Sequence, residues 1–373
     1  MSGLSRYADR LPPIAGDWVG LGEGATPTVA LPRLGVAIGL PRLRAKCEQV
    51  NPTGSYKDRI AALSLTLARE RGQRGWIATS SGNAGTSLGA YGARAGLPGL
   101  LLATPTITRE KLVPIQAVGT TVVRVADIGT GGSAAAAEAV FATVRRLAAQ
   151  HDLFLGVTAN ALNPDGMRGA DTIGYELAEE DAPQVVYVPT GGGGLSVCIA
   201  RGLAQADAPT RVVVAQPEGC APIARALAGE LEQPRVERCT TAISGLQLPS
   251  PPDGDAAVAG VRASGGWGTA VGDEAILDAQ RLLARLEGLF VEPAAATGVA
   301  AAAADAAAGR LARDADVVVV LTGSGAKDLA SAAGWAGAVA DCEPGEVGEV
   351  AARWLADELD VPAPPATGEA PAR

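Results

Sequence analysis

Histidine is nearly absent from this chain, which holds one, His151, among 373 residues. A serine–histidine catalytic triad is therefore excluded unless this single residue serves it. A place at a helix end or in a loop explains His151 without any chemistry. Proton transfers must then fall to lysine, to carboxylates, to hydroxyls or to a bound cofactor.

Cysteine is also scarce, and its spacing shows no pattern. The five cysteines are Cys47, Cys198, Cys220, Cys239 and Cys342. No two of them form a C-x-x-C pair, so the sequence indicates neither a metal-binding knuckle nor a disulfide framework. We therefore predict no metal site and expect the cysteines to be small buried hydrophobic residues.

Basic clusters and long apolar stretches are missing as well. The net charge is −9, the isoelectric point is about 4.9, and no Lys/Arg-rich block occurs. This balance argues against nucleic acid or an anionic membrane as a partner. No stretch resembles an uncharged span of roughly 18 residues, and the first ten residues lack the apolar core of a signal peptide. We therefore expect a cytoplasmic protein.

The composition does support a large folded core. Hydrophobic residues make up 47% of the chain and charged residues 19%. At this length the chain suits one unit with two lobes, or two domains. Short apolar runs at 100–103 and 122–125 predict buried strands, and alanine-rich runs at 133–149 and 294–307 predict helices. This alternation predicts an α/β fold with doubly wound parallel sheets.

Three turns of small residues each follow an apolar run that is typical of a buried strand. They cover residues 80–86, 190–196 and 322–325, after apolar runs at 76–78, 185–188 and 317–321. Open α/β sheets bind their ligands at the carboxyl ends of the strands. These turns are therefore candidate ligand-binding loops.

Lys57 stands directly after a Gly-Ser turn, in the segment Asn51-Pro-Thr-Gly-Ser-Tyr-Lys-Asp-Arg59, at the start of an amphipathic run. The positive end of a helix disfavours a second positive charge, so the free amine should be available to form a Schiff base. A solvated surface lysine is the structural alternative. Lys57 is our candidate catalytic residue and covalent anchor.

The turns offer different chemical groups. Four glycines, Gly191, Gly192, Gly193 and Gly194, precede Leu195 and open a helix-like run. Their backbone N–H groups and the helix dipole predict a cradle for a phosphate dianion, with a flexible linker as the alternative.

The turn at 80–86 offers both an amide and main-chain donors. The amide of Asn83 can hydrogen-bond a ring hydroxylate, although a purely structural turn is the alternative. The neighbouring N–H groups could hold a substrate carboxylate, which makes Ser80, Ser81 and Ala84 candidate substrate-binding residues. Thr322, in the third turn, supplies a neutral hydroxyl at a strand end.

An amine, a phosphate cradle, an amide and a neutral hydroxyl together match the needs of pyridoxal 5′-phosphate. The chain resembles the fold-type II, tryptophan-synthase-β-like family of pyridoxal-phosphate enzymes, and among them the threonine synthases most. The resemblance runs from about residue 20 to about residue 330 and rests on the blocks around Lys57 and Asn83 and on residues 22–27, 216–223, 245–247 and 321–328.

This resemblance implies two doubly wound parallel-sheet lobes with the cofactor between them. The larger, cofactor-binding lobe would comprise residues 1–43 and 157–360, and the smaller, mobile lobe residues 44–156. The Pro/Ala-rich tail, 361–373, is expected to be disordered. The resemblance also implies a homodimer that acts on a small amino-acid substrate.

The resemblance also implies roles for individual residues. Lys57 would form the internal aldimine, Asn83 would contact the cofactor's O3′, Gly191–Leu195 would hold its phosphate, and Thr322 would face the pyridine nitrogen. A neutral hydroxyl cannot keep that nitrogen protonated as a carboxylate would, which favours elimination and replacement over transamination. Glu292 resembles a family Glu-Pro at the pocket wall, but it could equally be a helix-start carboxylate.

In a threonine synthase the implied reaction turns O-phosphohomoserine and water into threonine and phosphate, through aldimine and quinonoid intermediates. Such a substrate needs a second anion site, and here the chain departs from the family. In residues 163–172, Arg168 stands at a usual Glu and Asp171 at a usual Lys; Leu195 and Ala84 replace a common Asn and Thr. Arg168 could clamp the substrate's phosphate or pair with Asp171 on one helical face.

These departures leave alternatives open. A serine/threonine dehydratase shows a similar glycine loop and needs no phosphate clamp, and a specialised replacement enzyme acting on a phosphorylated amino acid would suit the charge swap. A nucleotide-dependent dehydrogenase could use residues 129–134 as a G-x-G-x-x-A motif, but that motif lacks a clear acidic partner. It would also leave Lys57, Asn83 and the four glycines unexplained.

Overall fold

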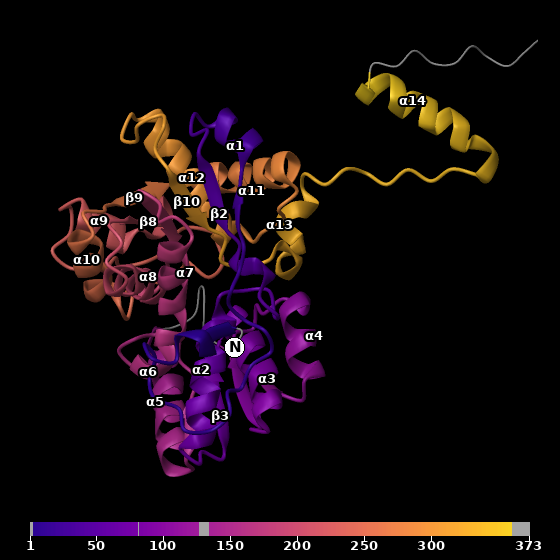
Figure 1. The fold of residues 1–373 in the computed structure, drawn as a ribbon. Helices are drawn as coiled ribbons and strands as arrows, with labels where there is room; N and C mark the ends of the chain where they lie inside the picture. The colour runs from indigo at the N-terminus through magenta and orange to yellow at the C-terminus, as the bar shows by residue number, and fades with distance from the viewer. Residues whose placement is uncertain (1–2, 81, 127–133, 360–373) are drawn as a thin grey trace, which may run out of the picture. The chain divides into compact units, whose positions relative to one another are not determined.

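The protein folds around two separate β-sheets, each covered by helices (Figure 1). The computed structural model describes residues 3–80, 82–126 and 134–359. Residues 1–332 form one compact unit. The helices of this unit are η1 (Gly3–Tyr7), α1 (Pro32–Ala37), η2 (Glu48–Val50), α2 (Lys57–Glu70), α3 (Asn83–Ala95), α4 (Arg109–Ala117), α5 (Ala134–Gln150), α6 (Pro164–Met167), η3 (Arg168–Ala170), α7 (Asp171–Glu179), α8 (Gly194–Gln205), η4 (Glu218–Cys220), α9 (Pro222–Leu227), α10 (Gly254–Ala263), α11 (Asp273–Glu287), α12 (Pro293–Ala307) and η5 (Gly325–Lys327), with α13 (Leu329–Ala333) at its end.

The second unit begins at Ala333. It contains η6 (Pro344–Glu346) and α14 (Val347–Leu359). The tail at 361–373, which we expect to be disordered, lies outside the described residues. Within the described ranges, no helix is long and apolar enough to cross a membrane.

The six-stranded sheet forms the centre of the larger lobe. Its order is β1 (Thr28–Ala30), β2 (Leu43–Lys46), β10 (Val317–Val320), β7 (Val185–Pro189), β8 (Arg211–Pro217) and β9 (Gly268–Val271). All neighbours pair in parallel except β1, which runs antiparallel to β2 at one edge. The predicted parallel sheet is therefore confirmed, with one antiparallel edge strand added.

The valines of β10 show why this sheet is buried on both faces. Val317 and Val319 pack into an apolar cluster with α1, α11 and α12. Val318 and Val320 point the other way, into a cluster with α7, α8 and α10. A strand covered on both faces needs a continuous apolar run, which is the pattern that predicted it.

The smaller lobe is built on a four-stranded parallel sheet. Its order is β5 (Thr121–Arg124), β4 (Gly99–Ala103), β3 (Gly75–Thr79) and β6 (Leu153–Leu155). Trp76 packs on the side of α2 and α3, while Ile77 packs on the opposite side with Val144 of α5. The predicted strands at 100–103 and 122–125 and the predicted helix ending near 149 are thus confirmed.

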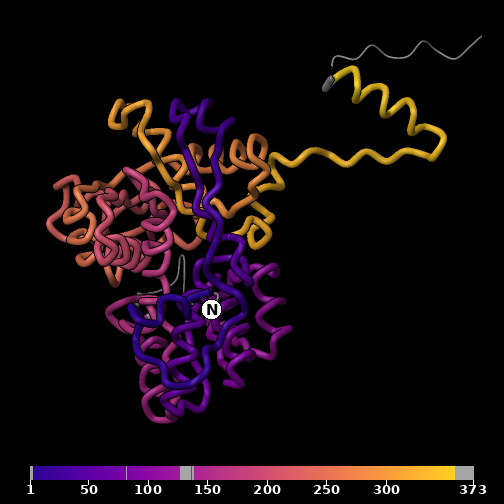
Figure 2. The backbone as a smooth tube through the Cα atoms, viewed as in Figure 1, coloured from indigo at the N-terminus to yellow at the C-terminus, as the bar shows by residue number. Residues whose placement is uncertain are grey.

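The N-terminal segment contacts the smaller lobe before the chain enters the larger sheet (Figure 2). Leu4 and Tyr7 pack in the same cluster as Leu63 and Trp76. In addition, residue 44 lies within β2, which pairs with β10. A lobe boundary at 44 would therefore fall inside a strand of the larger sheet. The lobe limits of 44 and 156 remain a prediction.

The prediction for the cysteines was wrong for one pair. Cys220 and Cys239 are joined by a disulfide across 19 residues of sequence. The chain reverses between them, and the N–H of Thr240 donates to the carbonyl of Gly219 at 2.8 Å. Because a long loop brings the two cysteines together, the sequence next to each of them does not predict this disulfide. Of the free cysteines, Cys47 and Cys198 are buried as expected, and Cys342 is exposed.

A buried ion network joins the start of α2 to the larger lobe. Arg59 is fully buried and pairs with Glu48 at 2.8 Å and with Glu176 at 2.6 Å. Lys46 is equally buried and pairs with Glu176 at 2.9 Å. Burial alone would raise the pKa of Glu176, but Arg59 and Lys46 outweigh it and lower that pKa from 4.5 to about 2.

We expect this network to make stability fall in acid. A carboxylate whose pKa is depressed in the folded state contributes stability above its unfolded pKa and loses it as the pH falls through the folded value. Glu176→Gln should therefore destabilise the protein by about 3–5 kcal/mol at neutral pH, the usual loss for a broken buried pair. The difference from the wild type should shrink between pH 4.5 and about 2. Urea unfolding of both proteins across this range checks it, and a constant difference would contradict it.

Candidate active site

A cavity of about 320 Å³ lies where the two sheets end, and this volume is within the usual size of a small-ligand pocket. The turns that follow β3, β7 and β10 all reach it, as does the chain after β6. Most residues that the sequence singled out line it: Lys57, Ser80, Asn83, Ala84, Gly191, Gly192, Gly193, Gly194, Leu195 and Thr322.

Lys57 is the first residue of α2, and its side chain is half-buried. Its Nζ donates to Oγ1 of Thr158 at 2.9 Å and lies 4.7 Å from the ring centroid of Tyr56. The turn before it is fixed to the end of β10, because the N–H of Tyr56 donates to the carbonyl of Thr322 at 3.2 Å. The amine is therefore held inside the cavity by a neutral hydroxyl.

The glycine loop has no room for side chains. Gly193 has a φ of +88°, which favours glycine, and a Cβ there would lie 2.8 Å from the carbonyl oxygen of Asp253. A Cβ on Gly191 would lie 2.7 Å from the carbonyl oxygen of Gly245. α8 begins at Gly194, and the first N–H groups of any α-helix lack partners within the helix. The loop and helix start thus present bare backbone donors to the cavity, as an anion site requires.

Asn83 opens α3 and is held by a buried carboxylate. Its Nδ2 donates to Oε2 of Glu292 at 2.6 Å, and Oε1 of Glu292 pairs with Nζ of Lys111 at 2.9 Å. Oδ1 of Asn83 is buried and has no hydrogen-bond partner among the described residues. The amide therefore retains hydrogen-bonding capacity toward a ligand in the cavity. Glu292 is also the N-cap residue of α12, so both sequence interpretations of it apply.

Thr322 and Ser80 lie at the ends of β10 and β3. Thr322 is 8% exposed and faces the cavity. Oγ of Ser80 accepts from the N–H groups of Gly82 and Gly85, both at 3.2 Å, so this hydroxyl shapes the loop itself. Substrate-binding roles for Ser80 and Ala84 remain predictions. Ser81 lies outside the described residues.

The expectation that Arg168 could bind substrate needs correction. Arg168 is absent from the cavity wall; its side chain donates to the carbonyl of Arg10 at 2.5 Å and lies 3.5 Å from the carboxylate of Asp171. Asp171 is also held by Arg201, at 2.6 Å. The ion-pair alternative is the one that the geometry supports. The helical turn at η3 directs Arg168 toward the N-terminal segment rather than toward the cavity.

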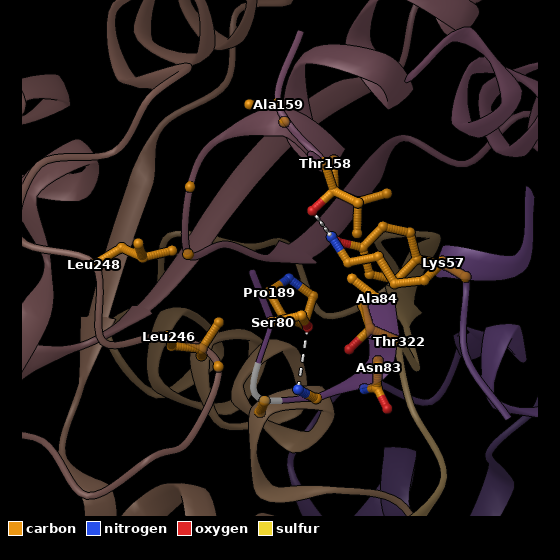
Figure 3. Close-up of a pocket in the computed structure, with 18 of the residues that line it drawn as sticks. Lys57, Ser80, Asn83, Ala84, Thr158, Ala159, Pro189, Leu246, Leu248 and Thr322 are labelled. Atoms are coloured by element: carbon orange, nitrogen blue, oxygen red, sulfur yellow. Dashed lines mark hydrogen bonds between the residues drawn. The ribbon is translucent and has the colours of Figure 1, made fainter. Parts of the chain in front are cut away.

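Several residues of the cavity were not predicted. Lys111 contacts Glu292, and Thr158 contacts Lys57. Leu246 and Leu248 lie across the cavity from Lys57 (Figure 3). The leucines come from the long loop between α9 and α10; residues 245–247 of this loop contribute to the family resemblance, but no role was predicted for either leucine. His151 follows α5 at the surface, as expected for a structural residue.

The sequence of residues 19–323 matches a family described as "Pyridoxal-phosphate dependent enzyme". The chain belongs to this family. It is therefore a pyridoxal-phosphate-dependent enzyme, and its threonine-synthase relatives make it a lyase.

Relatives and solved structures agree with this assignment. A threonine synthase of Methanosarcina acetivorans is 33% identical over 87% of this chain and 80% of its own length. One of Mycobacterium leprae is 33% identical over 87% and 88%, respectively. Maize serine racemase matches the fold with a TM-score of 0.68 at 22% identity, over 88% of this chain and 92% of its own. The processed form of threonine deaminase isoform 2 from Solanum lycopersicum matches with a TM-score of 0.66 at 21% identity, over 80% and 83%.

The residues present fit pyridoxal phosphate. The glycine loop lines the cavity with backbone that carries no side chains, next to the start of α8, which suits the phosphate. Asn83 and Thr322 line the same cavity as the amine of Lys57, and Nδ2 of Asn83 has a second hydrogen besides the one that it donates to Glu292. We propose that Lys57 anchors the cofactor, Asn83 contacts O3′, Gly191–Leu195 bind the phosphate, and Thr322 meets the pyridine nitrogen.

We expect Lys57→Ala to abolish both turnover and the visible absorbance of cofactor bound to the protein, because no other amine would form the covalent link. The fold should persist, since the buried residues of α2 are unchanged. Borohydride reduction followed by peptide mass spectrometry should place the cofactor on Lys57 in the wild type, and also in Lys111→Ala. Label on another lysine would refute the assignment.

We expect Thr322→Val to weaken cofactor binding by roughly 1–3 kcal/mol, because the pyridine nitrogen would lose its hydrogen-bond donor. Thr322→Ser, which keeps the hydroxyl, should bind nearly as tightly as the wild type. Fluorescence titration of the apoprotein with pyridoxal phosphate measures both. Equal affinity in all three proteins would place Thr322 away from the nitrogen.

Proposed function

We propose that the protein is a threonine-synthase-like lyase that converts O-phosphohomoserine and water to threonine and phosphate. The support comes from relatives of that name, which align over 87% of this chain. The structural observation that supports the proposal most is that the amine of Lys57 shares one cavity with Asn83, the glycine loop and Thr322. A neutral partner for the pyridine nitrogen suits elimination and replacement chemistry.

Each group in the cavity has a separate role in the proposed reaction. Pyridoxal phosphate, when bound, withdraws electrons from the Cα of the amino acid attached to it. Nζ of Lys57 would be the base that takes the Cα proton. Thr158 holds that amine at 2.9 Å and so keeps it over the cavity. The N–H groups at the start of α3 bind the substrate carboxylate and orient Cα toward Lys57.

One observation favours a second candidate, a serine/threonine dehydratase. In the described part of the cavity wall, the cations are Lys57 and Lys111, and Lys111 is already paired with Glu292. Leu195, Leu246 and Leu248 make another part of the wall apolar. A substrate whose leaving group is a hydroxyl needs no second anion site and fits such a wall.

Assembly and location remain part of the proposal. The family resemblance is the ground for a homodimer, and the cytoplasmic location is an expectation from the sequence.

We expect the wild type to release inorganic phosphate from O-phosphohomoserine with a kcat/KM at least about tenfold above that for 2-oxobutanoate formation from L-threonine, a difference of about 1.4 kcal/mol in barrier. Arg168→Ala should keep the same ratio, because Arg168 lies outside the cavity. Phosphate and oxo-acid assays on both proteins decide between the activities. Brisk oxo-acid formation without phosphate release would instead establish the dehydratase.

A further inference from the structure

The carboxylate of Glu292 connects elements that lie far apart in the sequence. It accepts from Asn83, 209 residues away, and pairs with Lys111 on α4. Glu292 is 5% exposed and Lys111 is 7% exposed. Because little water reaches either charge, each depends on the other for its stability.

Gly323 leaves the space that this contact needs. A Cβ at this position would overlap Oε2 of Glu292 and would lie 3.0 Å from Nδ2 of Asn83. The φ of Gly323 is outside the left-handed region, so the requirement is for space and not for an unusual backbone. The N–H of Glu292 also donates to the carbonyl of Gly323 at 3.0 Å, which fixes the two residues together.

A second buried lysine, Lys327, interacts electrostatically with the same carboxylate. It is 8% exposed, and its Nζ has no hydrogen-bond partner among the described residues. Burial lowers the pKa of Lys327 to about 8; Glu292 on α12 and Asp58 on α2 oppose this shift, and Lys111 on α4 adds to it. Lys327 therefore loses its charge near pH 8. Lys111, by contrast, contacts Glu292 directly in a salt bridge.

We propose that Glu292 is a positioning residue for pyridoxal phosphate, and that the positive charges of Lys111 and Lys327 hold its carboxylate in place so that it fixes the amide of Asn83. An ionised carboxylate only accepts hydrogen bonds, so it selects the orientation in which Nδ2 faces Glu292. The opposite orientation would bring Oδ1 against a carboxylate oxygen. Nδ2 has a second hydrogen, which remains for the O3′ oxygen of the cofactor.

This inference rests on the cofactor and on the proposed contact between Asn83 and O3′, and not on the identity of the substrate. It therefore stands for a threonine synthase and for a dehydratase alike. Its test uses the holoenzyme without substrate, so that failure of the inference and failure of the proposed reaction are separate results.

The first experiment compares the absorbance spectrum and cofactor affinity of the wild type with those of Glu292→Gln and Gly323→Ala. Glutamine can present either an oxygen or a nitrogen, so it no longer selects one orientation of Asn83. The alanine methyl displaces the carboxylate of Glu292 without removing any charged group from the chain. We expect the cofactor Kd to rise about tenfold in both, the size of one lost hydrogen bond, together with a shifted absorbance spectrum.

The second experiment follows the pH dependence of the same signals between pH 7 and 9. As Lys327 loses its proton near pH 8, Glu292 retains only Lys111, so the wild-type affinity should fall with rising pH. Lys327→Met should show no such step. The control is Glu230→Gln, which removes an exposed ion pair with Arg225 and should reproduce the wild-type curve.

The outcomes separate positioning from mere packing. A shifted spectrum in both Glu292→Gln and Gly323→Ala, with the pH step lost in Lys327→Met, supports the proposal. Variants that unfold at lower temperature but keep the wild-type spectrum, affinity and pH step give Glu292 a structural role only and overturn it. Should Glu292→Gln fail to fold, Gly323→Ala and Lys327→Met decide on the same criteria.

Discussion

The buried guanidinium of Arg59 is the constraint on which the placement of the site depends. Removing a charge from water costs several kcal/mol, and only a full set of hydrogen bonds offsets that cost. Arg59 has such a set, with Glu48, Glu176, Thr26 and Thr172 as partners. The partners come from separate segments of the chain, so α2 satisfies Arg59 in one position only. The first turn of α2, and with it Lys57 two residues earlier, is fixed by the same network.

The end of β10 applies a second constraint from the opposite side. Residues Ser55 and Gly323 form an isolated antiparallel bridge, and Val291 and Ser324 form another. The turn before Lys57 and the start of α12 are therefore both fixed to one strand end. Since Glu292 begins that helix, the amine and the carboxylate that holds Asn83 share a common frame. A catalytic geometry needs such support, because small displacements of reacting groups cost large factors in rate.

The sequence predicted what depends on local chemistry. Lys57 after a Gly-Ser turn, the glycines before α8 and the valines of β10 each carry their signal within a few residues, and the structure places all of them as expected. Contacts between distant segments carried no such signal. Lys111 meets Glu292 only because α4 and the start of α12 approach in the fold. The helical spacing of Arg168 and Asp171 gave their pairing as one of two alternatives. Arg201, which lies closer to Asp171, could not be predicted from that stretch.

The charge balance of the cavity bears directly on which substrate it accepts. We propose that the start of α8 binds the phosphate of the cofactor, and the charge of Lys111 is balanced by Glu292. In the described wall, Lys57 is then the one cation that contacts a neutral hydroxyl instead of a carboxylate. A phosphate on the substrate would find a cationic donor in Lys57 alone and uncharged donors elsewhere in this wall, so it would lack the ion pair that a second free lysine or arginine supplies. Recognition of such a phosphate would therefore depend on the same lysine that we propose as the base.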